Sequence, residues 1–286
     1  MDVLIVGAGA MGTWLGRAVD ASVTFADVDA DAAAAAADAV GNGAETTTLE
    51  GTDSYDVVAI AVPMTHAVDA IADHADRAEG AIVDVSGAMG PPLEAMRTHA
   101  PDRERASLHP LFAPERAPGS IAVVRDETGP TVETLLDALA TRGNDVLETT
   151  ATEHDDAMET VQAATHAAVL SFALAAEPVP DGFETPIYEG LGTLAEQMTE
   201  GTPRVYADIQ EAFDGADAIA DAAATVAEAD RDELESLYRE AADRWQADAA
   251  AEIDGTNGET DDGTGDTNDE TAKYETNGDA NGGTSR

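Results

Sequence analysis

The sequence predicts an α/β fold, with a doubly wound parallel sheet over residues 1–150, an all-α C-terminal domain over 151–251 and an acidic tail over 252–286. Three observations predict this organisation. In the first part, apolar runs typical of buried strands alternate with helical segments, which is the pattern of βαβ units. In the second part, every periodic segment has helical spacing. The third part contains almost no apolar residue, and such a composition favours disorder.

Each element of the first part follows from its own local pattern. Short apolar, β-branched runs predict strands. These runs lie at 2–6, 22–26, 56–63, 81–85, 106–108, 120–124 and 145–147. Segments with helical periodicity or a high alanine content predict helices between them. These segments lie at 13–19, 29–40, 65–78, 91–98 and 131–141.

The second part is predicted to be helical throughout. Its apolar stripes have the spacing of helix faces that pack into a core. The predicted helices lie at 152–176, 184–199, 205–213, 216–229 and 232–250. We expect this domain to hold the substrate and to pair with a second copy of the chain.

A glycine-rich turn joins the first strand to the first helix. The turn reads Gly7, Ala8, Gly9, Ala10, Met11 and Gly12. Gly7 permits a tight turn, Gly9 lets a pyrophosphate approach the backbone, and Gly12 lets the helix pack against the strand. The N-terminus of the helix then offers free N–H groups to the phosphates. A purely structural turn is the alternative, but a strand comes directly before these glycines, as a dinucleotide site requires.

An acidic residue supports the cofactor interpretation. Asp27 lies twenty residues beyond Gly7, at the end of the second predicted strand. A carboxylate at this place can bond the ribose hydroxyls and repel a 2′-phosphate, so it favours NAD over NADP. The first part is therefore predicted to be a Rossmann domain that binds NAD.

The charge of the chain excludes several kinds of partner. Fifty-eight acidic residues and fourteen basic ones give a formal net charge of −44. Such a surface repels nucleic acid and anionic lipid, so we expect neither as a partner. Because 43% of the residues are hydrophobic, we expect a folded protein adapted to a high-salt cytoplasm. At ~1 M salt the Debye length is roughly 3 Å and self-repulsion is screened. A halophilic protein of this kind would lose its fold in dilute buffer.

Features that the sequence lacks exclude further classes of protein and of binding site. There is no cysteine, which excludes disulfides and thiolate metal sites. No run of eighteen apolar residues and no secretory signal is recognisable, so we expect a cytoplasmic protein. His154, Asp155 and Glu159 have the side chains of metal ligands, but no second cluster accompanies them, so no metal site is predicted.

The candidate site residues follow the predicted strands. Ligands of an open α/β sheet bind beyond the carboxyl ends of its strands. Val62, Pro63, Ser86 and His109 occupy such positions, and two prolines that frame an aromatic residue follow His109. An imidazole held in a rigid loop is a candidate general acid or base.

Two polar residues of the first long helix are further candidates. Gln162 and His166 lie one helical turn apart, on one face of the helix predicted over 152–176.

The chain resembles the prephenate dehydrogenase family, especially its archaeal members. The matching residues are the glycine turn, Ala61-Val62-Pro63, His109-Pro110-Leu111-Phe112-Ala113-Pro114, Glu153-His154-Asp155, Val161-Gln162-Ala163-Ala164-Thr165-His166, and Pro186-Ile187-Tyr188-Glu189 followed by Tyr206-Ala207-Asp208-Ile209-Gln210. Their order and spacing agree up to about residue 245. The glycine turn is common to many dehydrogenases, whereas the His-Pro-hydrophobic-Phe-x-Pro segment is far more specific.

The resemblance implies an activity and roles for residues. It implies NAD-dependent oxidative decarboxylation of prephenate to 4-hydroxyphenylpyruvate, on the route to tyrosine. His109 would be the general base that takes the proton of the C4 hydroxyl, with a pKa near neutral. His166 would line the prephenate pocket, and Ser86 would lie near the hydroxyl and the nicotinamide. The resemblance also implies a homodimer formed through the helical domain.

Two departures from the family pattern concern binding. The family's serine is often one place later and followed by lysine, where this chain has Gly87 and Met89. Many members carry a carboxylate-binding arginine near the position of Pro186, which this chain lacks. Prephenate has two carboxylates, and burying them unpaired would be costly. Arg204 or Arg116 can replace that arginine, and the sequence leaves the choice open.

Three other functions are compatible with parts of the pattern. Arogenate dehydrogenase differs only in the side chain of its substrate. The β-hydroxyacid dehydrogenases use a catalytic lysine in their helical part, whereas the single lysine here, Lys273, lies in the tail. A non-catalytic NAD-sensing regulator would keep the glycine turn but would need neither His109 nor His166.

Overall fold

The computed structural model describes residues 1–255, with side chains up to residue 246. Two compact units divide the chain, Met1–Thr225 and Val226–Arg286. The tail predicted to be disordered falls almost wholly outside the described residues. Its first residues belong to the last helix, α11 (Arg231–Gly255).

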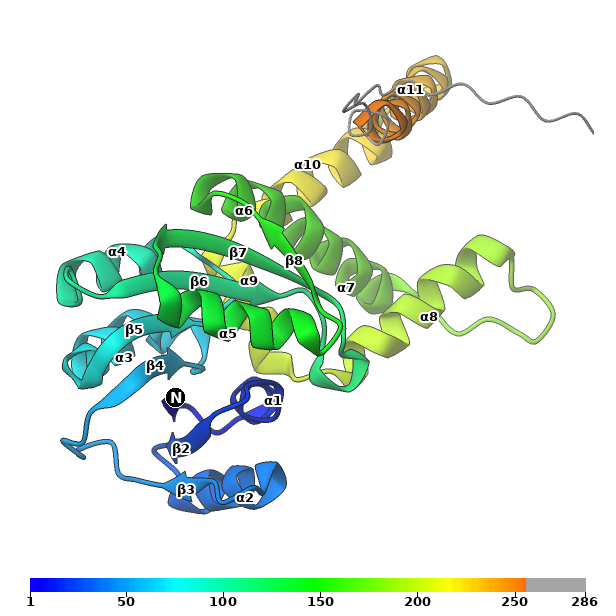
Figure 1. Ribbon diagram of the computed structural model, residues 1–286. Coiled ribbons are helices and arrows are strands. Elements are labelled where there is room, and N and C mark those ends of the chain that lie inside the picture. The colour runs from blue at the N-terminus through cyan, green and yellow to red at the C-terminus, as the bar shows by residue number, and fades with distance from the viewer. Residues whose placement is uncertain (256–286) are drawn as a thin grey trace, which may run out of the picture. The chain divides into compact units, whose positions relative to one another are not determined.

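The first unit is built on one eight-stranded sheet (Figure 1). The strand order is β3-β2-β1-β4-β5-β6-β7-β8. The strands are β1 (Asp2–Val6), β2 (Ser22–Ala26), β3 (Glu45–Thr46), β4 (Tyr55–Ile60), β5 (Ala78–Asp84), β6 (Glu104–Pro110), β7 (Ser120–Glu127) and β8 (Asp145–Glu148). The chain reverses its direction of winding between β1 and β4, which is the switch point where ligands of such sheets bind. The predicted Rossmann-like α/β fold is confirmed.

The sheet is parallel except at one pair. β6 and β7 run antiparallel, with His109 opposite Ala122. Parallel strands need a crossover of a dozen or more residues, usually with a helix, and only residues 111–119 join these two strands. The sheet predicted to be parallel therefore reverses at β6–β7, because this connection is too short for a crossover, and β7 and β8 run opposite to the other six strands.

Alternate residues of the strands face two separate cores. Val3 and Ile5 of β1 pack under one set of helices, and Leu4 and Val6 pack under the other. The first set is α1 (Ala10–Ala18), α2 (Ala30–Val40) and α5 (Pro130–Thr141), and the second is α3 (Ala67–His74) and α4 (Gly90–His99). Because both faces are covered, the central strands are apolar at almost every position.

Two parts of the pattern differ from the sequence prediction. β3 was not predicted, because a strand of two exposed residues leaves no periodic signal. The long helix predicted over 152–176 is divided into α6 (Ala151–Met158), a π-helical segment (Glu159–Ala164) and α7 (Thr165–Ala175). Such π-helical turns occur frequently at functional sites.

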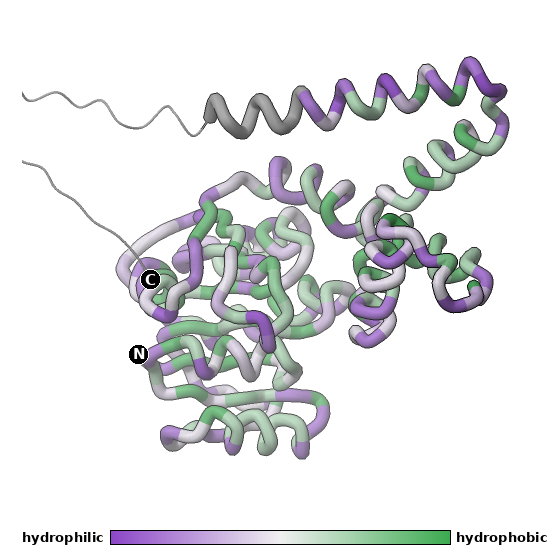
Figure 2. Tube along the Cα trace, turned by 90° about the vertical axis from the view of Figure 1, so that its right-hand side faces the viewer, coloured by the Kyte–Doolittle hydropathy of each residue, from purple (hydrophilic) through white to green (hydrophobic). Residues whose placement is uncertain are grey.

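Only helices follow β8 in the described residues. They continue with α8 (Pro186–Glu200), α9 (Pro203–Ala212) and α10 (Gly215–Glu228). In the second unit, α11 alternates hydrophilic and hydrophobic residues along its described part (Figure 2) and carries ion pairs such as Arg244–Glu240. Among the helices of residues 1–255, none has the length and apolar composition that crossing a bilayer requires. The assignment of 151–251 as a substrate and dimerisation domain stays a prediction.

Candidate active site

The glycine turn is closed by backbone contacts at the end of β1. The Gly7 N–H donates to the Ala26 carbonyl at 2.8 Å, and Gly7 has a φ of +105°. A Cβ at Gly7 would lie 2.3 Å from the carbonyl oxygen of Ala61, just before Val62 and Pro63. A Cβ at Gly12 would lie 2.0 Å from the Gly7 carbonyl oxygen. The turn therefore requires glycine at both positions, as the sequence predicts.

The Gly7→Ala variant is expected to lose more than about 2 kcal/mol of unfolding free energy. Its methyl group meets fixed backbone, and alanine is strained at positive φ. Gly9→Ala is the matched control, because no atom lies within 4 Å of a Cβ there. Thermal unfolding of both variants checks this expectation. A Gly7→Ala protein as stable as the Gly9→Ala protein would contradict it.

Asp27 lies beside this turn. Its carboxylate accepts hydrogen bonds from the Ala8 N–H at 2.7 Å and from the Asp29 N–H at 2.9 Å. Gly9 caps α1 without a side-chain hydrogen bond, so the helix N-terminus stays open to an anion. These contacts hold a carboxylate close to a helix end that could accept a phosphate.

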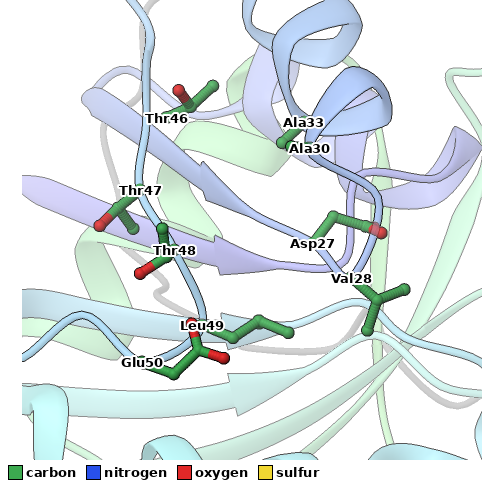
Figure 3. A pocket seen from close by; sticks show the side chains of 9 residues that line it. All are labelled: Asp27, Val28, Ala30, Ala33, Thr46, Thr47, Thr48, Leu49 and Glu50. Carbon is green, nitrogen blue, oxygen red and sulfur yellow. The ribbon is translucent and has the colours of Figure 1, made fainter.

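A hollow of about 490 Å³ opens next to Asp27 (Figure 3). Figure 3 shows the segment Thr46–Glu50 along one side of the hollow, with Asp27 and Val28 on the other. The residues that line it are Asp27, Val28, Ala30, Ala33, Thr46, Thr47, Thr48, Leu49 and Glu50. The lining offers hydroxyl groups and two carboxylates and no cation. It suits a neutral, hydroxyl-bearing group better than a phosphate.

A chain of hydrogen bonds connects His109 to an anchored carboxylate. His109 is buried in β6, and its Nδ1 lies 2.9 Å from Nε2 of His154. Nδ1 of His154 lies 2.8 Å from Asp155 Oδ1. The Asp155 carboxylate also accepts the N–H groups of Met89 and Gly90 at the start of α4, both at 2.9 Å. Burial acts to raise the pKa of Asp155, but the hydrogen bonds from these partners outweigh it and hold the pKa below its ordinary value.

These bonds determine which nitrogen of each imidazole carries the proton. An ionised carboxylate only accepts, so His154 Nδ1 carries a proton and Nε2 of the same ring is an acceptor. Nδ1 of His109 must then donate to His154, which leaves His109 Nε2 unprotonated, with a lone pair that can accept. A fixed lone pair of this kind is what a general base needs.

The pKa of His109 differs from the near-neutral value expected from the sequence, because of its surroundings in the fold. Burial and the neighbouring His154 lower the pKa of His109 from 6.5 to about 3, although Asp155 acts in the opposite direction. His109 is therefore a neutral base throughout the physiological range. Because the unfolded chain still binds this proton near pH 6.5, the site disfavours folding progressively as the pH falls from 6.5 towards 3.

Polar residues of the helical region lie near the lone pair of His109 Nε2. Gln162 Nε2 donates an N–H to it at 3.3 Å. His166, further along the same helical run, packs edge-to-face on Tyr206 at 4.9 Å between ring centroids. Burial lowers the pKa of His166, and its Nδ1 is buried without a hydrogen-bond partner among the described residues. On the same helix as Tyr206, Arg204 Nη2 lies 3.0 Å from His66 Nε2.

The Ser86 hydroxyl bonds to neighbours in its own segment of the chain. It contacts Oδ2 of Asp84 and lies 2.9 Å from the carbonyl oxygen of Ala88. The residue beside His109 is Gly87, where a Cβ would lie 3.7 Å from Nε2. The role predicted for Ser86 therefore remains a prediction, with its hydroxyl committed to its own loop.

The structure adds residues that the sequence did not single out for catalysis. His154 and Asp155, considered above as metal ligands, bond instead to each other, and His154 also bonds to His109. They were part of the resemblance, in Glu153-His154-Asp155, and this was the only sequence signal for them. His66 gave no signal of its own, because its partner Arg204 is distant in the chain. Tyr206 was matched only as part of the resemblance, and Asp84, which bonds to the nearby Ser86, stands out only through its burial.

Comparisons with known proteins agree with this architecture. No protein-family model matches the sequence. The 4-amino-4-deoxyprephenate dehydrogenase of Streptomyces pristinaespiralis is 33% identical over 236 residues, covering 76% of this chain and 78% of that protein.

Solved structures show the same fold. The prephenate dehydrogenase of Aquifex aeolicus, in complex with hydroxyphenyl propionate and NAD⁺, matches with a TM-score of 0.64 at 15% identity, over 90% of this chain and 97% of that one. The arogenate dehydrogenase of Synechocystis matches with a TM-score of 0.52 at 15% identity, over 90% and 98%. The Streptomyces relative, alike over about three quarters of both chains, shows that this protein belongs to the prephenate and arogenate dehydrogenase family of oxidoreductases.

Proposed function

We propose that the protein oxidises and decarboxylates prephenate to 4-hydroxyphenylpyruvate with NAD, using His109 as the general base. The observation that carries this proposal is the lone pair of His109 Nε2, fixed by His154 and Asp155. It lies at the carboxyl edge of a sheet whose first turn suits a dinucleotide. A non-catalytic NAD sensor would have no use for this arrangement.

The chemistry balances with one proton held by the chain. NAD held by the Gly7–Gly12 turn and Asp27 would supply the acceptor for the hydride of C4 of the substrate ring. His109 Nε2 takes the proton of the C4 hydroxyl as the C4–O bond becomes a carbonyl. The bond from C1 to the carboxylate then breaks, carbon dioxide leaves, and its electron pair makes the ring aromatic. The phenolate oxygen formed at C4 recovers the proton from His109, so no net proton is released.

The residues at the first turn fit NAD. The Gly7–Gly12 turn and the open end of α1 suit the pyrophosphate, and Asp27 suits the ribose hydroxyls. The hollow beside Asp27 is lined by hydroxyls and carboxylates with no cation, so a 2′-phosphate would be repelled. Val62 and Pro63, after β4, would border the cofactor on the other side of the switch point.

Arg204 is proposed to bind a substrate carboxylate. It is a half-exposed guanidinium that contacts His66 and stands two residues from Tyr206, which packs on His166. Gln162, beside His109 Nε2, is proposed to donate its amide N–H to the C4 oxygen. Pairing with Arg204 would offset the cost of burying the negative charge of a substrate carboxylate in so acidic a protein.

The assay for this proposal is NADH formation in molar KCl. Prephenate, arogenate and 4-amino-4-deoxyprephenate are compared as substrates, each with NAD and with NADP. We expect turnover with prephenate and NAD. Turnover only with the 4-amino substrate, which the name of the Streptomyces relative makes the second candidate, would reassign the substrate. NAD binding without turnover of any of the three would favour the sensor.

The expected homodimer remains part of the proposal. Large apolar side chains are exposed on and near α7 and α8, including Leu174, Phe183 and Ile187, each more than three-quarters exposed. Contiguous exposed apolar surface is typical of an interaction site. Light scattering in molar KCl measures the mass, and a monomer would contradict the proposal.

A further inference from the structure

A buried carboxyl group bonds to the loop that contains Gly87, the residue beside His109. Asp84 ends β5, and its side chain is 0% exposed. Its Oδ2 accepts the Ser86 N–H at 3.1 Å and makes a very short contact with the Ser86 hydroxyl. Among the described residues, Oδ1 has no hydrogen-bond partner and no cation pairs with the carboxyl group. The proposed reaction makes no use of this group.

The hydrogen bonds around Ser86 require one more proton than Ser86 supplies. Its oxygen lies in bonding distance of Asp84 Oδ2 on one side and of the Ala88 carbonyl oxygen, at 2.9 Å, on the other. A hydroxyl carries one proton, and a carbonyl oxygen can only accept. Both contacts are hydrogen bonds only if Asp84 carries a proton and donates it to Ser86, which then donates to Ala88.

Burial and a nearby negative charge favour the neutral form of Asp84. Ile60 of β4 and Ser107 of β6 flank it in the sheet, and Asp155 of α6 contributes a negative charge. Burial raises the pKa of Asp84 from 3.8 to about 7; Ser86 and the Ser107 hydroxyl oppose this rise, and Asp155 adds to it. An isolated buried carboxylate would neutralise itself in the same way.

We propose that Asp84 is a positioning residue, held as a neutral carboxylic acid that fixes the Ser86–Ala88 loop beside His109, and that loss of its proton ends activity on the alkaline side. Gly87, in the middle of this loop, is the residue next to His109 Nε2 and to the Met64 side chain. When Asp84 ionises, the Ser86 proton turns to it, and the Ala88 carbonyl faces an oxygen without a proton. The loop must then move. His109, which stays neutral far below pH 7, cannot supply such a limit.

The first test does not depend on activity. Asp84→Asn keeps the shape and a donor N–H but cannot ionise, and Asp69→Asn removes one charge from an exposed site on α3 as a control. The unfolded chain ionises at the ordinary value of 3.8 and the folded chain at about 7. The unfolding free energy of the wild type therefore falls as the pH rises from 3.8 to about 7. Relative to wild type, the unfolding temperature of Asp84→Asn should rise across this range, and that of Asp69→Asn should not. A constant difference for Asp84→Asn would overturn the proposal.

A second measurement uses the unaltered protein, in case Asp84→Asn fails to fold. Infrared spectra at about pH 6, where exposed carboxyl groups are ionised, should contain the carbonyl band of a protonated carboxylic acid. The band should disappear as the pH passes about 7. Its absence at about pH 6 would show an ionised Asp84 and overturn the proposal.

The activity test rests on the proposed function and is read separately. With prephenate and NAD, kcat/KM of the wild type should fall by roughly tenfold for each pH unit above the Asp84 pKa. Asp84→Asn should lack this fall, whereas Asp69→Asn should keep it. An equal fall in both variants would overturn the role of Asp84. Absence of turnover in the wild type would contradict the proposed function alone, since the unfolding and infrared measurements would still report on Asp84.

Discussion

Replacing His109 by asparagine is expected to lower kcat by about 10²–10⁴-fold, the contribution of a positioned general base. Asparagine is smaller than histidine but keeps a polar side chain with an N–H donor for His154, so the fold and the cofactor site should persist. The side chain cannot accept a proton at the place where His109 Nε2 presents its lone pair. NADH formation from prephenate at saturating NAD measures the loss.

The control for this variant is His99→Asn, on an exposed position at the end of α4. It changes the same side chain outside the site, and its kcat should equal that of the wild type. NAD binding, followed by quenching of tryptophan fluorescence, should be unchanged in both variants. Equal kcat values for His109→Asn and the wild type would remove His109 from the mechanism.

Asp155→Asn is expected to lower kcat by about 10²-fold through groups that never touch the substrate. The carboxylate of Asp155 accepts from His154, Met89 and Gly90 at once. An amide has a single oxygen, so it must oppose one of these N–H groups with its own. It also removes the negative charge that stabilises the imidazolium formed when His109 takes its proton.

Asp156→Asn is the matched control for this second variant, because the neighbouring Asp156 is exposed and bonds to none of these groups. Nitrogen NMR of the imidazoles adds a readout that a merely structural role would not change. In the wild type, His109 Nε2 should give the signal of an unprotonated nitrogen. A kcat for Asp155→Asn equal to that of Asp156→Asn would contradict a catalytic role for the hydrogen-bond chain from His109 through His154 to Asp155.

Much of the fold could be predicted because the apolar pattern is local. β-Branched runs separated by helical segments define the order of strands and helices, and the glycine turn marks the switch point. Glu45–Thr46 gave no signal because the strand is short and exposed. The direction of β7 is set by the length of residues 111–119, a constraint that the alternation of elements does not express.

The site was predictable only in part, for a related reason. Local sequence patterns identify His109 and the glycines. They do not identify the hydrogen-bond chain from His109 through His154 to Asp155. His154 stands 45 residues from His109, and only the packing of α6 against β6 brings the two rings together. The hydroxyl direction of Ser86 and the pKa of His109 depend on burial, which a single sequence does not contain.

The short connection between β6 and β7 also affects the order in which the chain folds. Every other neighbouring pair of strands is separated by at least one helix, so its closure costs more conformational entropy. Antiparallel pairing across residues 111–119 has the lowest contact order in the sheet and can form before the crossovers are complete. The strand that carries His109 would then belong to the folding nucleus. Substitutions of buried residues such as Leu108 or Val123 would slow folding more than they speed unfolding.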